Sequence, residues 1–222
     1  MTTPFLTLST TEAAFLADLP QRKINQVVDD CILPPRLYTS SAKARRFVPM
    51  AAALVRFYFD AEKVVAASAR KQILAELVKR VHTLPAEETA RILMLTSKGR
   101  KATWHVQPQD FVDINLAGFV DATMVKLHLL QKANQAVEVN PAVMGGAPVF
   151  KGTRVPVRVV LESLRQGDDF HELKEDYPFL TEELVELAQV YDALHPQRGR
   201  PKSLREQFLD WRVERQTVHH PV

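Results

Sequence analysis

The sequence predicts a mainly α protein with two helix-turn-helix domains. We expect an N-terminal winged helix-turn-helix domain over residues 1–82 and a C-terminal three-helix domain over residues 139–195. Three observations predict this fold: two helix starts within the first 30 residues, a basic proline-flanked segment directly after them, and three short amphipathic segments between residues 157 and 195. Residues 83–138 are then a connector of helices and short strands, or part of a dimer interface, and residues 196–222 form a basic tail.

The first predicted helix pair begins with a capping box. The Ser9 hydroxyl can cap a helix start while Glu12 reaches back to the same turn, and this helix should run to about Ala17. Asp18 and Pro20 then predict a second helix, with Asp18 as its N-cap and the proline in its first turn. Two short helices joined by a tight turn are typical of a helix-turn-helix.

The second of these helices has one apolar and one polar face. Apolar residues recur at i, i+3, i+4 and i+7, which predicts a buried stripe of Ile24, Val27, Val28 and Cys31. The opposite face offers cationic and amide side chains that suit the phosphates and major-groove base edges of DNA. We therefore predict DNA contacts from Arg22, Lys23 and Gln26.

The segment that follows, PPRLYTSSAKARRFVP, is predicted to form a basic hairpin or loop. After a helix-turn-helix, such a hairpin is typical of a wing, which places cations near the DNA backbone. On this interpretation Lys43, Arg45 and Arg46 also bind DNA. The alternative is an exposed loop whose charges are simply solvated.

The C-terminal domain is predicted to contain three short helices. The first has the apolar stripe Val157, Val160, Leu161 and Leu164 and ends at Gly167, and the second covers about Phe170 to Glu175. Thr181 caps a third helix, whose first residues, Glu182 and Glu183, suit its positive N-terminal end. The stripe of that helix is Leu184, Leu187, Ala188 and Tyr191.

Before this domain lies an unusual stretch, NPAVMGGAPVFKGTRVPV, at residues 140–157. It is not a phosphate-binding loop of the form G-x-x-x-x-G-K-[ST], because Lys151 precedes the glycine and Pro148 removes a backbone N–H. A hairpin fits better, with Gly152 and Thr153 in a type II′ turn. Such a hairpin displays Lys151 and Arg154 at its tip, and Pro156 then presets the first turn of the next helix.

The same stretch and the helices after it also follow a family pattern. The pattern is a proline, Gly-Gly-x-Pro, Lys-Gly-Thr-Arg, a Pro-Val helix start, a glycine after that helix and Tyr-Pro-x-Leu-Thr. It is present as Pro141, Gly145, Gly146, Pro148, Lys151, Gly152, Thr153, Arg154, Pro156, Val157, Gly167 and Tyr177 to Thr181. Residues 139–193 therefore resemble the small helical family called domain of unknown function 433.

This resemblance implies a homeodomain-like three-helix fold and a function. Members of that family resemble VapB-like antitoxins of bacterial type II toxin–antitoxin pairs, and their usual neighbours are PIN-like or related small ribonucleases. Longer members carry an N-terminal MerR-like or winged helix-turn-helix. The resemblance thus implies an antitoxin that neutralises a ribonuclease and represses its own operon. It gives the motif a role in partner binding, at Gly145, Gly146, Lys151, Gly152, Thr153, Arg154 and Pro156.

Charge decides which domain should bind DNA. Residues 1–82 contain twelve Lys and Arg against seven Asp and Glu, whereas residues 156–195 contain three against ten. The last predicted helix carries Glu182, Glu183, Glu186 and Asp192 and no Lys or Arg, so phosphates would repel it. We expect the acidic domain to contact protein, either a second copy or the basic RNA groove of a ribonuclease.

The basic tail has three interpretations. Arg198-Gly199-Arg200-Pro201 is similar to the core of an AT-hook, which enters the minor groove of DNA. Alternatively the tail orders on the toxin, or it forms a helix packed on its own protein. We favour toxin binding, through Arg198, Arg200, Leu204, Phe208 and Trp211.

Composition excludes other classes. No apolar run reaches the roughly 18 residues of a membrane span, the first residues lack the pattern of a secretory signal, and a single cysteine excludes an internal disulfide. The seven histidines show no metal-ligand spacing. We predict a cytoplasmic protein that is not an enzyme, binds no metal or cofactor, contacts no membrane and forms a homodimer. The alternatives to an antitoxin are a stand-alone DNA-binding regulator, or an adaptor whose helix-turn-helix modules only dimerise.

Overall fold

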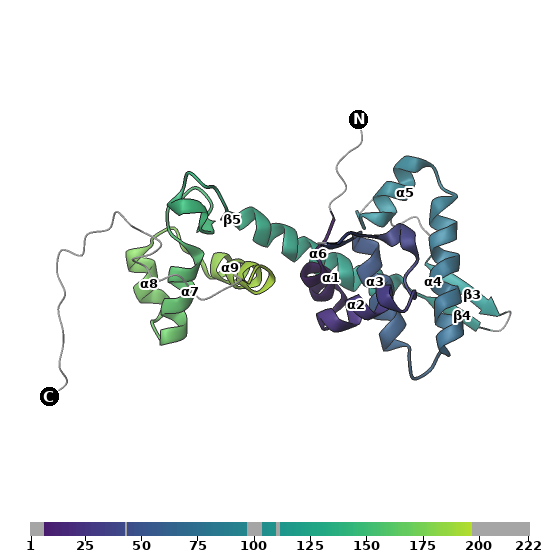
Figure 1. Cartoon of the computed structure of the whole chain (residues 1–222). Helices are drawn as coiled ribbons and strands as arrows, with labels where there is room; N and C mark the ends of the chain where they lie inside the picture. The colour runs from purple at the N-terminus through teal and green to yellow at the C-terminus, as the bar shows by residue number, and fades with distance from the viewer. Residues whose placement is uncertain (1–6, 43, 97–103, 110–111, 197–222) are drawn as a thin grey trace. The chain divides into compact units, whose positions relative to one another are not determined.

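The computed structural model describes residues 7–42, 44–96, 104–109 and 112–196, which form a mainly helical chain, as predicted (Figure 1). The chain divides into two compact units, Met1–Gln131 (unit 1) and Lys132–Val222 (unit 2). Most of the predicted connector, up to residue 131, therefore belongs to unit 1. Whether it contributes to a dimer interface stays a prediction.

Unit 1 begins with the predicted helix pair, α1 (Thr10–Ala17) and α2 (Gln21–Asp29). The capping box is confirmed: the Ser9 N–H donates to Glu12 Oε2 at 2.7 Å, and the Glu12 N–H donates to Ser9 Oγ at 3.2 Å. The predicted N-cap of α2 is wrong. Asp18 instead ends α1 in a left-handed conformation, φ 60°, and Pro20 precedes the first turn of α2.

The prediction that Cys31 is buried with α2 is also wrong. Ile24, Val27 and Val28 are buried as expected, but α2 ends at Asp29 and Cys31 has φ 50°, so the chain leaves the helix before the fourth position of the stripe. Cys31 is exposed, and the next two residues, Ile32 and Leu33, are buried in its place.

The basic segment forms the predicted hairpin. After the short 3-10 helix η1 (Pro35–Leu37), strands β1 (Tyr38–Ser40) and β2 (Arg45–Phe47) pair antiparallel, with Thr39 opposite Arg46. Phe47 is buried and also pairs with Leu8, through backbone hydrogen bonds of 2.8 and 2.9 Å. The hairpin is thereby held against the start of the chain.

The rest of unit 1 packs around a buried helix. Helix α3 (Pro49–Asp60) is almost entirely buried and is followed by α4 (Ala67–His82), α5 (Ala86–Leu93), the hairpin of β3 (His105–Gln109) and β4 (Val112–Asn115), and α6 (Ala117–Ala136). Arg70 of α4 is buried; its guanidinium donates to the Tyr58 carbonyl and lies 4.3 Å from the Tyr58 ring centroid. It therefore satisfies a carbonyl in the last turn of α3, where helix carbonyls lack partners.

Unit 2 contains the three predicted helices and a small sheet. Helices α7 (Val157–Gln166), α8 (Phe170–Asp176) and α9 (Glu182–Leu194) enclose a core that includes Phe150, Val160, Leu161, Leu173, Leu180 and Ala188. Gly167 ends α7 with φ 104°, and the Thr181 hydroxyl accepts from the Leu184 N–H, both as predicted. Val185 and Leu194 are the buried residues of α9 that the predicted stripe omitted.

The glycine-rich stretch differs in detail from the predicted hairpin. After the 3-10 turn η3 (Met144–Gly146), strand β6 (Val149–Phe150) pairs with β5 (Val137–Glu138), and the Phe150 N–H also donates to the Val155 carbonyl at 3.0 Å. The Thr153 N–H donates to the Phe150 carbonyl, so Gly152 is the third residue of the turn, not the second. Its φ of 77° at that position is what a type II turn requires. The predicted type II′ turn is therefore wrong.

Two glycine substitutions should have opposite effects on stability. No atom lies within 4 Å of a Cβ added at Gly152 or at Gly118, but only Gly152 has a positive φ. We expect Gly152→Ala to lower the free energy of unfolding by about 1–2 kcal/mol through backbone strain alone. Gly118→Ala, within α6, should raise it by roughly 0.5 kcal/mol. Urea unfolding followed by circular dichroism measures both, and an unchanged midpoint for Gly152→Ala would contradict the turn.

Candidate functional site

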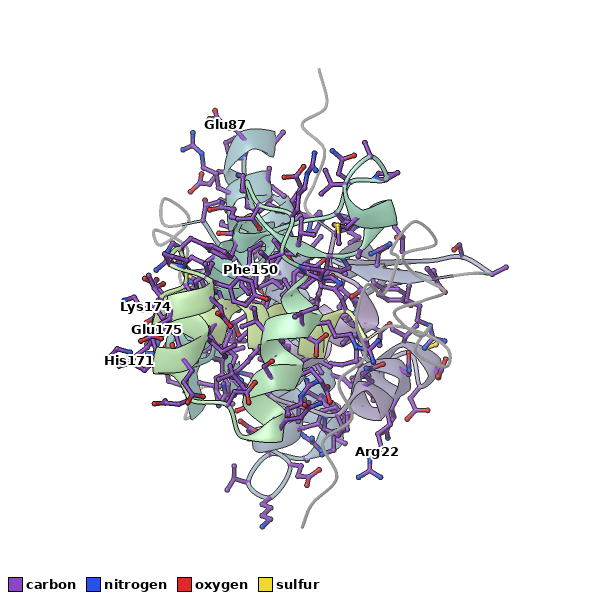
Figure 2. The ribbon with its side chains drawn as sticks, turned by 90° about the vertical axis from the view of Figure 1, so that its left-hand side faces the viewer. Arg22, Glu87, Phe150, His171, Lys174 and Glu175 are labelled. Carbon is purple, nitrogen blue, oxygen red and sulfur yellow. The ribbon has the colours of Figure 1, made fainter. Side chains whose placement is uncertain are left out.

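The predicted DNA-binding residues of α2 are not equivalent. Arg22 is exposed and projects away from the ribbon (Figure 2), and it forms no ion pair with any residue that the structure describes. Lys23 is half-buried, with its Nζ 4.2 Å from the ring centroid of Phe59. Gln26 is exposed and donates to Asp30 Oδ2 at 3.3 Å. Arg22 and Gln26 can therefore reach a partner directly, whereas Lys23 covers the end of α3.

Arg45 joins the hairpin to α2. One guanidinium nitrogen donates to Asn25 Oδ1 at 3.0 Å, and the other lies 2.5 Å from Asp29 Oδ1. Because Arg45 is half-buried and its charge is neutralised, its role here is to position the hairpin, and it is a weaker candidate for a phosphate contact than predicted. The sequence pattern gave no sign of this pairing, since Arg45 and Asp29 lie on separate elements.

Arg46, the next residue of β2, is exposed and has no ion pair within residues 7–42, 44–96, 104–109 and 112–196. Successive side chains of a strand point to opposite faces, so the pairing of Arg45 with α2 leaves Arg46 on the other face of the hairpin. Arg36 of η1 is a further exposed cation beside β1, which our sequence prediction omitted although it lies in the same basic segment. Lys43, also predicted to bind DNA, lies outside the described residues.

A second ion pair connects α6 with the turn between α1 and α2. Lys126 Nζ lies 2.7 Å from Asp18 Oδ1 and 5.4 Å from the ring centroid of Phe15. The hydrogen bond and the positive charge of Lys126 lower the pKa of the Asp18 carboxyl below its ordinary value. Lys126, which belongs to neither α1 nor α2, thereby holds the turn between these two helices in place.

In unit 2 the family motif separates into backbone and surface roles. Gly145, Gly146 and Gly152 have positive φ, and Thr153 Oγ1 donates to the Phe150 carbonyl at 2.8 Å. Pro156 immediately precedes α7. These residues build two backbone turns and the start of α7, while the side chains of Lys151 and Arg154 remain exposed for a partner.

The acidic residues of α9 are partly neutralised within unit 2. Glu183 Oε1 accepts from Lys132 Nζ at 2.9 Å, and Asp192 Oδ2 accepts from Arg165 at 3.0 Å. Glu182 and Glu186 are exposed, and neither has an ion-pair partner in the described part of the chain. The exposed negative charge of α9 therefore comes from these two. The predicted toxin-binding tail, Arg198 to Trp211, lies outside the described residues.

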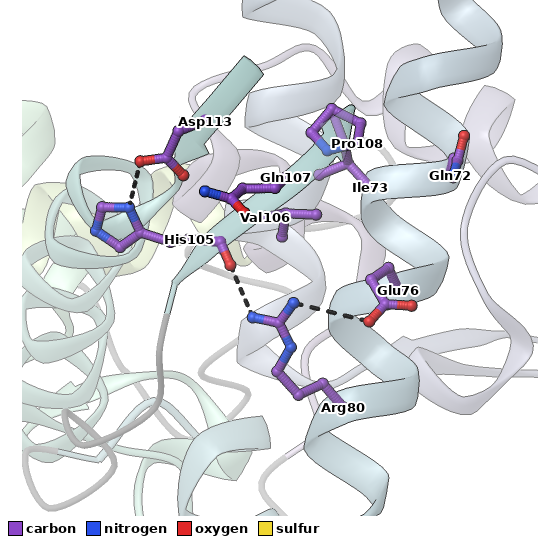
Figure 3. Close-up of a pocket in the computed structure, with 9 residues that line it drawn as sticks. All are labelled: Gln72, Ile73, Glu76, Arg80, His105, Val106, Gln107, Pro108 and Asp113. Carbon is purple, nitrogen blue, oxygen red and sulfur yellow. Dashed lines mark hydrogen bonds and ion pairs between the residues drawn. The ribbon is translucent and has the colours of Figure 1, made fainter. Parts of the chain in front are cut away.

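Two open depressions lie among the described residues of unit 1. One, of about 500 Å³, lies between α4 and the β3–β4 hairpin (Figure 3). There Arg80 donates to the His105 carbonyl at 2.7 Å, and His105 Nδ1 lies 3.0 Å from Asp113 Oδ2. The nine lining residues include a His–Asp pair but no Ser, Thr or Cys beside it that could act as a nucleophile. The other, of about 870 Å³, is lined mainly by apolar residues of α6 and of the end of α5 and the segment after it.

No helix among the residues that the structure describes combines the length and the apolar character needed to cross a membrane. Within the same residues, no three His, Cys, Asp or Glu side chains gather in a way that could hold a metal ion.

Both a family model and a protein of known sequence match this chain. Residues 137–191 match the family model described as "Protein of unknown function (DUF433)", which confirms the resemblance carried by the motif and assigns it to unit 2. Over 196 residues the chain is 31% identical to the uncharacterized protein y4eO of Sinorhizobium fredii, covering 87% of this chain and 83% of that protein. The chain belongs to the same protein family as y4eO. A crystal structure of Rv2018 from Mycobacterium tuberculosis shares 18% identity and a TM-score of 0.38, covering 85% of this chain and 99% of that one.

The ion pair between Asp18 and Lys126 makes a pH-dependent prediction. Because the folded pKa of Asp18 is lowered, its contribution is present above the unfolded pKa of about 3.9 and is lost as the pH falls through the folded value. Asp18→Asn, which tolerates the left-handed backbone, should lower the free energy of unfolding at pH 7 by up to about 1 kcal/mol. The difference from wild type should shrink below about pH 4.

Chemical unfolding at several pH values measures this effect, and Lys126→Met provides the control. The double variant should lose no more stability than either single variant, because both remove the same pair. Additive losses would show that the two residues act independently.

Proposed function

We propose that this protein is a cytoplasmic antitoxin of a bacterial type II toxin–antitoxin pair, which binds a PIN-like ribonuclease through unit 2 and represses its own operon through unit 1. The observation that carries the proposal is the arrangement of α2 and the β1–β2 hairpin. Arg22 and Arg46 are exposed on these two adjacent elements, neither has an acidic partner among the described residues, and Arg45 holds the elements together. The arrangement supports a winged or MerR-like helix-turn-helix.

The polarity of α2 supports DNA binding at its N-terminal end. Of the two acids at its other end, Asp29 pairs with Arg45, whereas Asp30 accepts a hydrogen bond from the neutral Gln26 and keeps its charge. The cations Arg22 and Lys23 near the start of α2 therefore face one unneutralised carboxylate, that of Asp30, which lies at the opposite end of the helix. A positive field over an exposed helix attracts phosphates, and Gln26 can add a hydrogen bond to a base edge.

The charge of α9 supports a protein partner for unit 2. Glu182 and Glu186 would be repelled by a nucleic acid but attracted to the basic groove of a ribonuclease. Unit 2 contains the DUF433 domain, and the resemblance to that family implies the antitoxin role.

The second candidate function is a stand-alone DNA-binding regulator without a nuclease partner. It is favoured by the position of the candidate DNA contacts, all of which lie in unit 1. DNA binding by unit 1 does not require a toxin.

Charge reversal tests the proposed DNA surface. We expect the double variant Arg22→Glu and Arg46→Glu to bind the DNA upstream of its own reading frame at least tenfold more weakly than wild type. The dependence of binding on salt should fall by a slope of about 2, since each phosphate contact contributes roughly 0.9. Fluorescence anisotropy at several salt concentrations measures both quantities.

The matched control is Lys71→Glu, which reverses an exposed cation of α4, outside the helix pair and the hairpin. It should bind nearly as wild type. An equal loss in the control would point to general electrostatic attraction, and unchanged binding of the double variant would place the DNA surface elsewhere.

Co-expression with the adjacent reading frame tests the nuclease partner. If the neighbour alone stops growth, we expect this protein to restore growth and to co-purify with it. Glu182→Lys with Glu186→Lys should weaken co-purification while leaving DNA binding intact. Glu62→Lys, an exposed acid of unit 1, is the control. A harmless neighbour that does not co-purify would favour the stand-alone regulator.

A further inference from the structure

One apolar side chain of unit 1 projects into solvent beside a groove that it does not fill. Val125 of α6 is 71% exposed, although most of the large apolar residues of unit 1 are buried. A single exposed valine is ordinary on a protein surface. Val125 differs because it borders a depression of about 870 Å³ between α6 and the end of α5.

The buried part of the groove lining is apolar. Its lining includes Ile92, Leu95, Trp104, Val120, Met124 and Leu127, most of which are at least nine-tenths buried, and Met124 is half-exposed. The projecting valine and the apolar groove thus lie on one continuous surface. A surface that carries both a projection and a complementary depression can pair with itself about a two-fold axis.

An acidic side chain and an imidazole of α6 also lie symmetrically about the midpoint between Met124 and Val125. Asp121 and His128 are both exposed, both line the groove, and they lie three residues before Met124 and three residues after Val125. Neither has an oppositely charged partner in the part of unit 1 that the structure describes. If a second α6 lies antiparallel with its two-fold axis between Met124 and Val125, each Asp121 faces His128 of the other copy.

We propose that α6 is the interface of an antiparallel homodimer, in which Val125 of each copy enters the groove of the other. The two Asp121–His128 contacts fix the register, and burial of the apolar groove supplies the association energy. The occupant is a second copy because the antiparallel repeat of this helix presents an acid and an imidazole at matching positions. The inference depends on neither DNA nor a nuclease, although a dimer would present two α2 helices to a two-fold operator.

The first test is the mass of the full chain in solution. Sedimentation equilibrium should give twice the 25.1 kDa of the chain for wild type. Val125→Asp should raise the dissociation constant at least tenfold. Val64→Asp is the matched control, because Val64 is 84% exposed but does not line the groove. A monomeric wild type, or equal effects of the two variants, overturns the proposal.

The second test measures the register of the two α6 helices in the dimer, and it needs no variant that weakens the interface. In a Cys31→Ser background, which removes the exposed native thiol, Val125→Cys should form an intermolecular disulfide on mild oxidation. Asp121→Cys alone should not, because the two copies of residue 121 would be offset by seven residues, about 10 Å along the helix. A mixture of Asp121→Cys and His128→Cys should crosslink. Self-crosslinking of Asp121→Cys, or failure of the mixture, overturns the antiparallel interface.

Discussion

The candidate DNA surface depends on how the β1–β2 hairpin is held against the helix pair. Phe47 anchors its inner side, since it is 1% exposed and exchanges two backbone hydrogen bonds with Leu8, directly before the capping box of α1. Arg45, on the same face of β2 as Phe47, is bound to Asn25 and Asp29 of α2. An apolar anchor and a charged one therefore act on alternate residues of one strand, on either side of Arg46. Together they determine where the exposed side chain of Arg46 lies relative to that of Arg22.

The sequence could predict the features that depend on neighbouring residues. The capping box at Ser9, the Thr181 cap and the glycine that ends α7 each follow from a local rule about unsatisfied backbone groups, and each is confirmed. The DUF433 match is confirmed as well. The mainly helical fold follows from periodicity in the same way.

The failures have a common physical cause, which is competition from contacts distant in sequence. Asp18 satisfies the local rule for an N-cap, but its carboxylate binds Lys126 of α6 and its backbone closes α1. The DNA-binding role predicted for Arg45 stays a prediction, but its pairing with Asp29 likewise could not be read from the local pattern. In the glycine-rich stretch, the turn was predicted from residues 149–155 alone, whereas β6 also pairs with β5, which the prediction did not consider. A pattern of residue types indicates which groups need partners, but not which partner they find.

In both units, ion pairs within the protein influence the sign of the charge that remains exposed. At α2, Arg45 neutralises Asp29, so the cations Arg22 and Lys23 outnumber the one acid that keeps its charge, Asp30. In α9 the available cations are used by two acids, Glu183 with Lys132 and Asp192 with Arg165, so the exposed excess is Glu182 and Glu186. Formal charge counted along the chain only approximates this outcome, because paired charges contribute little at a distance. The charges left unpaired are those that a partner meets first. They give unit 1 a surface suited to phosphates and give α9 one suited to a basic protein.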